Sequence, residues 1–288
     1  MHGARASRHR QASPSRRTRM TPFDRHLSLW NLRADGAPIR THSSDLLPVR
    51  HGAQPAMLKI PRDAEEKFGG MMMQWWSGDG AARVYAHDEE ALLLERACGP
   101  RSLAHMARNG RDEEATRILC ETLERLHAPR AAPAPANLVP LRTWFADLET
   151  HARSHGGVLV RSWEIAQELL AQPREVMPLH ADIHHENVLD AGAERGWIAI
   201  DPKRVIGERG FDFANLFTDP DKETALAPGN FERRLALVVE HGRIERRRLL
   251  QWIAAFQGLS AAWFIIDDDE CEKEFEIIRK ALAELDRG

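Results

Sequence analysis

The sequence predicts an α+β protein with a small, β-rich N-terminal part and a larger, mostly helical C-terminal part. Between residues 21 and 97, short apolar runs alternate with turn residues, which is typical of β-hairpins. Beyond about residue 101, apolar side chains recur mainly at helical spacing. The chain has 288 residues, of which 43% are hydrophobic, so it can bury a substantial core.

Residues 1–20 differ from the rest of the chain. They contain six arginines, no acidic residue and no apolar run, so they cannot bury a core and are expected to be a disordered basic tail. The Arg16-Arg17 pair is not followed by a hydrophobic segment, which argues against an export signal. We expect Met20 to be the true start of the protein.

Charge and cysteine usage narrow the possible functions. The formal net charge of −3 argues against a nucleic-acid partner held by bulk electrostatic attraction. Cys98, Cys120 and Cys271 are scattered and form no CxxC motif, so reduced thiols and a cytoplasmic location are expected. No stretch approaches the roughly 18 apolar residues expected of a membrane span, so no membrane partner is predicted.

The N-terminal part begins with a predicted hairpin that carries a lysine. Residues 48–50 lead through a turn at Gly52 into an apolar strand at residues 56–60, and Lys59 lies in this strand. Residues 63–76 follow and are predicted to form a helix with two adjacent glutamates near its start. A strand lysine near a helix glutamate is a candidate ion pair.

A second hairpin and a series of helices follow. Residues 83–86 and 91–96 are predicted to pair as strands around an acidic turn. Helical spacing of apolar side chains then predicts helices over residues 112–127, 141–155, 162–171 and 231–285.

The chemistry is concentrated between residues 179 and 201. Asp182 and Asn187 lie in a polar loop, Val188-Leu189 and residues 197–200 are predicted to form a short hairpin, and Asp201 ends its second strand. The hairpin would return Asn187 and Asp201 to neighbouring positions, where their oxygens could bind Mg²⁺. Asp182 could then orient and deprotonate an attacking hydroxyl. Asp201 precedes a proline, so an extended backbone is expected there.

This pattern, HxDxxxxN followed by an apolar strand ending in Asp, resembles the catalytic core of the protein-kinase-like fold. More narrowly, LHADIHHENVLD and GWIAIDPKRVIGERGFDFANLF resemble the aminoglycoside/hydroxyurea resistance kinases, which include streptomycin 6-kinases. The resemblance implies a two-lobed fold, with an N-lobe at residues 21–97 and a C-lobe at residues 98–288. It also implies ATP- and Mg²⁺-dependent phosphoryl transfer to a hydroxyl of a small cationic molecule, such as an aminoglycoside of the streptomycin type.

The same resemblance implies roles for several residues. Lys59 would pair with the α- and β-phosphates, and Glu66 would hold it in place. Backbone groups from about Glu95 to Ala97 would form the hinge that binds adenine. Asp212 would brace the catalytic loop through backbone hydrogen bonds.

One feature departs from protein kinases, as it also does in the resembling family, and another departs from that family itself. A glycine-rich phosphate loop is missing, and residues 41–45 stand in its place, so Ser43 and Ser44 are the candidates to cap the phosphates. Ala181 replaces the family's usual glycine beside His180, which is expected to be structural. If that position needs a positive φ, the alanine costs of order 1 kcal/mol.

Candidates for contact with the acceptor are fewer. Asp267 and Asp268 belong to an acidic cluster after a predicted buried helix, and such carboxylates suit a polycationic ligand. His185 is a further candidate. Streptomycin, another aminoglycoside, hydroxyurea and an unrelated metabolite remain open as acceptors.

Two other readings of the motif are possible. His180 and Asp182 with a distal His241 resemble the facial triad of Fe(II) oxygenases, although the helical C-terminal half and Asn187 do not fit that fold. A kinase-shaped protein that binds its ligand without catalysis is the second alternative.

Overall fold

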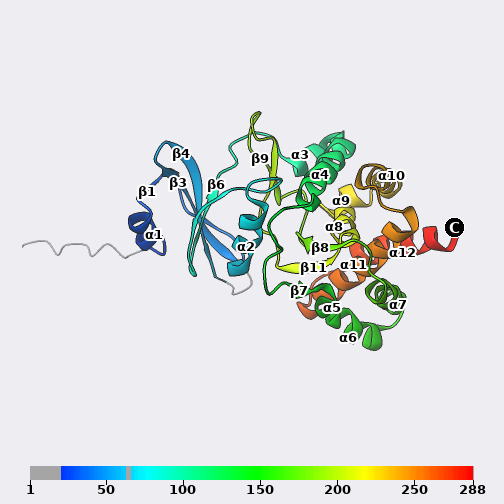
Figure 1. The fold of residues 1–288 in the computed structure, drawn as a ribbon. Coiled ribbons are helices and arrows are strands. Elements are labelled where there is room, and N and C mark those ends of the chain that lie inside the picture. The colour runs from blue at the N-terminus through cyan, green and yellow to red at the C-terminus, as the bar shows by residue number, and fades with distance from the viewer. Residues whose placement is uncertain (1–20, 63–65, 288) are drawn as a thin grey trace, which may run out of the picture.

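The computed structural model describes residues 21–62 and 66–287, and their side chains except those of residues 66–68. The predicted tail at residues 1–20 lies outside this range. The N-lobe, blue to cyan in Figure 1, lies beside a larger helical C-lobe. The N-lobe elements are α1 (Asp24–Leu29), β1 (Leu32–Ala34), β2 (Ile39–Arg40), β3 (Ser44–His51), β4 (Gln54–Pro61), α2 (Glu66–Trp76), β5 (Val84–His87) and β6 (Leu92–Glu95).

The N-lobe is built on one antiparallel sheet of six strands, in the order β1-β3-β4-β6-β5 with β2 paired to β3. Both predicted hairpins, β3–β4 and β5–β6, are confirmed. Gly52 adopts φ +61° in the tight β3–β4 turn, a conformation that glycine adopts without a steric penalty. Val49 and Leu58 are fully buried on one face of the sheet, which explains the alternating pattern of the sequence.

The C-lobe combines helices with two small sheets. Its helices are α3 (Leu103–Met106), η1 (Ala107–Arg111), α4 (Asp112–His127), α5 (Leu141–Trp144), α6 (Ala146–His155), α7 (Val158–Ala171), α8 (Gly210–Ala214), η2 (Asn215–Phe217), α9 (Lys222–Ala225), α10 (Asn230–Gly242), α11 (Arg246–Ile266) and α12 (Glu272–Arg287). Its strands are β7 (Val139–Pro140), β8 (Val176–Leu179), β9 (Val188–Asp190), β10 (Trp197–Ala199) and β11 (Val205–Glu208). The predicted helix at residues 112–127 is confirmed with the same bounds, and the predicted strands at 188–200 form the β9–β10 hairpin.

Helix α11 is the centre of the C-lobe core. In the described part of the chain, it is the one helix long and apolar enough to cross a membrane. The expectation that no segment has the length and apolar composition of a membrane span was therefore wrong for α11. Most of the apolar 18-residue window, 67%, is buried against the rest of the lobe, and a helix that is apolar all round is typical of a protein core.

The C-lobe core brings α11 against the segment that follows β11. Trp252 packs edge-on against Phe211, with ring centroids 6.0 Å apart, and Phe145 packs on the same Phe211 ring. Gly210 is required at this contact, because a Cβ there would lie 2.4 Å from the Trp252 ring. The aromatic contact fixes the segment that carries Asp212.

A buried ion pair joins the same two elements. Arg248 Nε donates to Glu208 Oε1 at 2.8 Å, and Trp252 Nε1 donates to the same oxygen at 2.8 Å. Burial acts to raise the pKa of Glu208, but the hydrogen bonds from Arg248, the Arg174 N–H and Trp252 outweigh it and lower that pKa. Glu208 is therefore charged, and its charge depends on Arg248.

Replacing Arg248 by methionine should lower the free energy of unfolding by about 3–5 kcal/mol, because it leaves the Glu208 carboxylate buried without its counter-charge. Urea unfolding followed by circular dichroism measures the change. Arg246→Met is the control, since Arg246 pairs with Glu284 from an exposed position on the same helix. The control substitution should lower the free energy of unfolding by less than about 1 kcal/mol. Equal effects of the two substitutions would contradict this account of the C-lobe core.

Candidate active site

The β9–β10 hairpin brings the predicted metal ligands together. Strand β8 leads into the catalytic loop, residues 180–187, and the loop leads into β9. The N–H of Ile200 donates to the carbonyl of Asn187 at 2.9 Å, so Asn187 lies beside the residue that precedes Asp201. The predicted return of these two residues to neighbouring positions is confirmed.

Lys59 connects the two lobes at this point. Its Nζ lies 2.7 Å from Oδ1 of Asp201, and the lysine is only 3% exposed. Helix α2 begins at Glu66, but the Glu66 side chain lies outside the described residues, so the predicted Lys59–Glu66 pair stays a prediction. Strand β4 thus delivers a buried cation to the end of the β9–β10 hairpin.

Asp182 is held by its neighbours in the catalytic loop and after β10. The Asn187 amide donates to the Asp182 carbonyl at 2.8 Å and approaches Oδ2 at 3.3 Å. Lys203 Nζ lies 3.5 Å from Oδ2. Burial raises the pKa of Asp182, while the charges of His184 and Lys203 oppose that shift. The carboxylate is oriented on one side and faces a lysine on the other.

Asp212 braces the start of the catalytic loop. Its Oδ2 accepts from the N–H of His180 at 3.0 Å, and its Oδ1 accepts from the N–H of Ala181 at 2.7 Å. His127 Nε2 lies 2.8 Å from Oδ2. The backbone contacts that the sequence resemblance implied for Asp212 are therefore present.

His180 connects the loop to the end of β10. Its Nε2 lies 2.9 Å from the Ile200 carbonyl, and its ring stacks on Trp76 of α2. Burial lowers the pKa of His180 to about 4, so the ring is neutral and Nε2 donates to that carbonyl. Nδ1 can then accept the N–H of Asp182 at 3.3 Å. This contact supports the structural role expected for His180.

Two residues of the site adopt the left-handed conformation. Ala181 has φ +63°. The position therefore has the positive φ at which an alanine in place of the family's glycine is expected to be strained. Asp201 has φ +56°, so the extended backbone predicted there was wrong. The preference imposed by the following proline is modest, aspartate tolerates positive φ better than most residues, and the contact with Lys59 fixes its carboxylate.

The donor set suits a magnesium ion that is also bound by water and phosphate. The Asn187 amide nitrogen is engaged by Asp182, so the amide oxygen is the atom that could bind a cation. Among the described residues there is no group of three His, Cys, Asp or Glu side chains that could hold a metal. One carboxylate and one amide oxygen fit Mg²⁺, which usually keeps waters and substrate phosphates. Asn187 and Asp201 stay predicted ligands.

The turn that stands in place of a glycine-rich loop is only partly available to a nucleotide. Ser44 begins β3, is 1% exposed, and its N–H donates to Thr41 Oγ1 at 3.0 Å. Its predicted contact with phosphate is not supported by this arrangement, because strand pairing has buried it. Ser43 lies half-buried in the turn, where its carbonyl accepts from the N–H of Arg62, and it stays a candidate.

The hinge prediction also needs a correction. The N–H of Glu95 donates to the Arg83 carbonyl at 2.8 Å, and its carboxylate binds Arg195. The Glu95 N–H is therefore not available to adenine, because it is bonded to Arg83. The prediction also included backbone carbonyls, so the Glu95 carbonyl and Ala97, which follows the end of β6, stay predicted contacts.

The three acceptor candidates have different surroundings. Asp267 and Asp268 are exposed at the end of α11. His185 is 2% exposed, and neither ring nitrogen has a hydrogen-bond partner among the described residues. Burial and nearby positive charges lower its pKa well below the usual range. None of these observations establishes a contact with substrate.

Sequence reasoning missed Asp219. Burial raises the pKa of this carboxyl, and its charge also acts to raise the pKa of Asp182. No motif marks Asp219, and the one available signal was an acidic residue two positions after the GFDFANLF segment.

The iron-triad alternative is not supported. His241 lies in α10 and lines a cavity with His127 and Arg243. His180 is buried, and its ring is engaged with the Ile200 carbonyl and the Asp182 N–H. The three residues of the proposed triad are therefore not gathered into a metal site.

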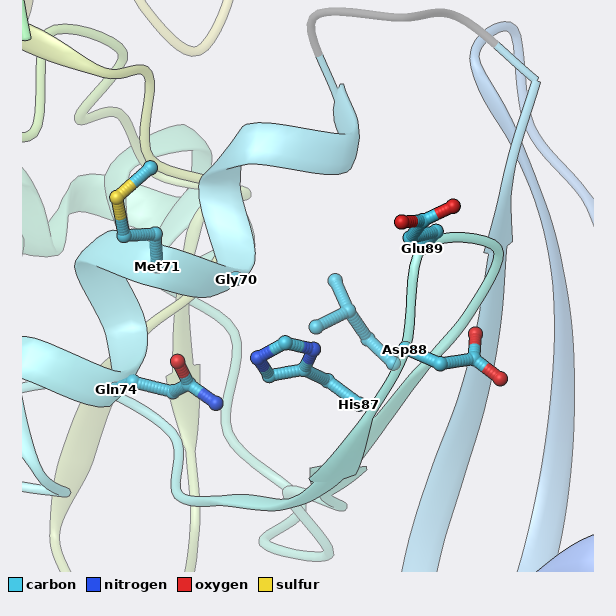
Figure 2. A pocket seen from close by; sticks show the side chains of 7 residues that line it. Gly70, Met71, Gln74, His87, Asp88 and Glu89 are labelled. Atoms are coloured by element: carbon cyan, nitrogen blue, oxygen red, sulfur yellow. The ribbon is translucent and has the colours of Figure 1, made fainter. Parts of the chain in front are cut away.

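A cavity of about 660 Å³ lies between α2 and the β5–β6 turn. Figure 2 shows the side chains of Gln74 and His87 directed toward one another across it. None of the predicted site residues is among the described residues that line it. This cavity is therefore separate from the Lys59–Asp201 contact.

Changing Ala181 to glycine should raise the free energy of unfolding by about 1 kcal/mol, because glycine adopts the observed positive φ without a Cβ clash. Ala199→Gly is the control in neighbouring β10, where φ is not positive and the substitution should be destabilising. Denaturant unfolding measures both. A loss of stability in Ala181→Gly equal to that of the control would contradict the strain assigned to this position.

Comparisons with known proteins agree with this geometry. The family model described as aminoglycoside/hydroxyurea antibiotic resistance kinase matches residues 29–268. A streptomycin 3''-kinase of Klebsiella pneumoniae is 53% identical over 243 residues, covering 83% of this chain and 90% of the relative. A streptomycin 6-kinase of Streptomyces griseus is 32% identical over 252 residues, covering 83% of this chain and 80% of the relative.

A solved structure shows the same fold at low sequence identity. A thermostable mutant of aminoglycoside phosphotransferase APH(4)-Ia, in a ternary complex with ADP and hygromycin B, is 12% identical with a TM-score of 0.61. The match covers 93% of this chain and 97% of that chain. The family match over residues 29–268 and the 53% identity to a streptomycin 3''-kinase show that the chain belongs to the aminoglycoside/hydroxyurea antibiotic resistance kinase family.

Proposed function

We propose that this kinase transfers the γ-phosphoryl group of ATP to streptomycin, at the 3''-hydroxyl. The observation that carries the proposal is the 53% identity to a streptomycin 3''-kinase over 90% of that protein. Identity to the streptomycin 6-kinase is 32%, so the 6-kinase type suggested by the sequence motifs is the less favoured regiochemistry. The free thiols of Cys98, Cys120 and Cys271 support a cytoplasmic location, where ATP is available.

In this mechanism, Asp182 accepts the proton of the attacking hydroxyl. Its orientation is set by the Asn187 amide and by the backbone contacts of His180 and Asp212. Phosphoryl transfer asks little basicity of such a group, because its transition state is loose, and positioning contributes most of the effect. The rigid loop therefore matters more than the raised pKa of Asp182.

On the donor side, Lys59 binds phosphate oxygens. Its near-complete burial and its contact with Asp201 keep the ammonium aimed at the end of the β9–β10 hairpin. Asn187 and Asp201 would hold Mg²⁺, which when bound neutralises phosphate charge. Because Lys59 comes from the N-lobe and the other groups from the C-lobe, the donor site requires both lobes.

Incubation of the protein with ATP, Mg²⁺ and streptomycin should give one phosphorylated product. Mass spectrometry detects the added phosphoryl group, and phosphorus–proton correlation by NMR identifies the hydroxyl that carries it. We expect the 3''-position. Phosphate at the 6-position would overturn the regiochemistry, and transfer only to another aminoglycoside or to hydroxyurea in the same screen would overturn the acceptor.

Asp182→Asn should lower kcat with streptomycin by about 10²–10⁴-fold, because the amide cannot accept the proton. Circular dichroism should show an intact fold, and calorimetry should show nearly unchanged ATP affinity. Glu194→Gln removes an acidic charge from the exposed turn of the nearby β9–β10 hairpin and serves as the control. A fully active Asp182→Asn variant would show that Asp182 is not the base.

Removal of divalent cations with EDTA should abolish transfer, and added MgCl₂ should restore it. Asn187→Ala should need a higher Mg²⁺ concentration for half-maximal rate, since it removes one of the two predicted protein ligands. Titration of initial rate against free Mg²⁺ measures this. An unchanged Mg²⁺ requirement in the variant would exclude Asn187 as a ligand.

A further inference from the structure

Another cavity lies in the C-lobe, and Lys203 connects it to the catalytic loop. It has a volume of about 420 Å³ and is lined by Thr143, Trp144, Asp147, Lys203 and Trp263. These residues come from α5, α6, the end of α11 and the segment after Asp201, which are distant in sequence. The volume falls in the range of small-molecule sites.

Lys203 connects this cavity to the catalytic base. Its Nζ lies 3.5 Å from Oδ2 of Asp182, and its N–H donates to the His180 carbonyl at 2.9 Å. One wall of the cavity is therefore anchored to the catalytic loop and lies within one side chain of Asp182.

The opposite wall is aromatic and rigid. Trp144 and Trp263 meet edge to face, with ring centroids 5.5 Å apart, and Trp144 also packs against Phe211 of the buried core. Both tryptophans are only half-buried, although they belong to a tight aromatic cluster. Their remaining surface is available to a flat or cationic group.

Asp147 adds a negative charge to this wall. Trp263 Nε1 donates to Asp147 Oδ2 at 3.0 Å, which holds the carboxylate against the indole. A carboxylate can accept about four hydrogen bonds, so one indole donor leaves most of its capacity for a ligand. A fixed carboxylate in a cavity lined by two indole rings is suited to a planar cation that donates in pairs.

We propose that this cavity is the acceptor site, and that a guanidinium group of the acceptor lies against Trp144 and Trp263 and pairs with Asp147. The proposal rests on the proposed function, because streptomycin is the acceptor that supplies this group. Lys203 repels the cation from the catalytic end of the cavity. The acceptor is thereby held in one direction, with its cationic end at Asp147 and a hydroxyl directed toward Asp182.

This placement differs from the one predicted from the acidic cluster. Asp267 and Asp268 follow Trp263 by one turn and lie exposed in solvent. Exposed carboxylates of this kind attract a polycation over distance, but they do not fix its orientation. Asp147, held by an indole and bordered by a cavity, can do so.

The test compares Asp147→Asn with Glu149→Gln. Both remove one carboxylate from α6, but Glu149 pairs with Arg153 and is not among the residues lining the cavity. Asp147→Asn should raise KM for streptomycin about 10- to 100-fold, as expected for a lost charge-assisted hydrogen bond, and leave KM for ATP unchanged. Glu149→Gln should change neither constant. Equal streptomycin KM values for the two variants would overturn the proposal.

A binding measurement separates failure of this inference from failure of the proposed function. Calorimetric titration with agmatine, a small guanidinium compound, tests the cavity without turnover. If the wild type does not phosphorylate streptomycin, the proposed function fails. A guanidinium site would still be supported if agmatine binds the wild type, binds Asp147→Asn more weakly, and binds Glu149→Gln as tightly as the wild type. Agmatine binding that is absent from the wild type, or equal in both variants, would overturn the site in that case.

Discussion

The site depends on one buried carboxylate, that of Asp212. It accepts hydrogen bonds from the consecutive N–H groups of His180 and Ala181, and those bonds hold Ala181 in a left-handed conformation that an alanine would otherwise avoid. The constraint turns the chain so that Asp182 is presented next to Asn187. The aromatic packing around Phe211 keeps this carboxylate in place, so the C-lobe core supports the catalytic loop directly.

A short series of contacts connects the loop that Asp212 holds to the N-lobe. The neutral ring of His180 bonds the Ile200 carbonyl, Asp201 follows Ile200, and Asp201 pairs with Lys59 of β4. Each link is short and mostly buried, so the position of the N-lobe lysine is coupled to the geometry of the loop that carries Asp182. Within this series, the contact between Lys59 and Asp201 is the one that joins the two lobes.

Much of this arrangement could be predicted from the sequence. Helical and strand periodicity identified the β3–β4 hairpin and α4, and the spacing of Asp182, Asn187 and Asp201 predicted the hairpin that brings them together. Features set by tertiary contacts could not be predicted. The left-handed backbone of Asp201, the burial of Ser44 and the engaged N–H of Glu95 all depend on partners distant in sequence. The wall formed by Trp144, Asp147 and Trp263 has no linear motif for the same reason.

The most direct measurement is a crystal structure of the protein with a non-hydrolysable ATP analogue, Mg²⁺ and streptomycin. The account predicts a streptomycin hydroxyl at about 2.6–3.2 Å from the Asp182 carboxylate and in line with the γ-phosphate, with the metal on Asn187 and Asp201. A bound streptomycin whose nearest hydroxyl faces another side chain, with Asp182 directed away from it, would contradict the account.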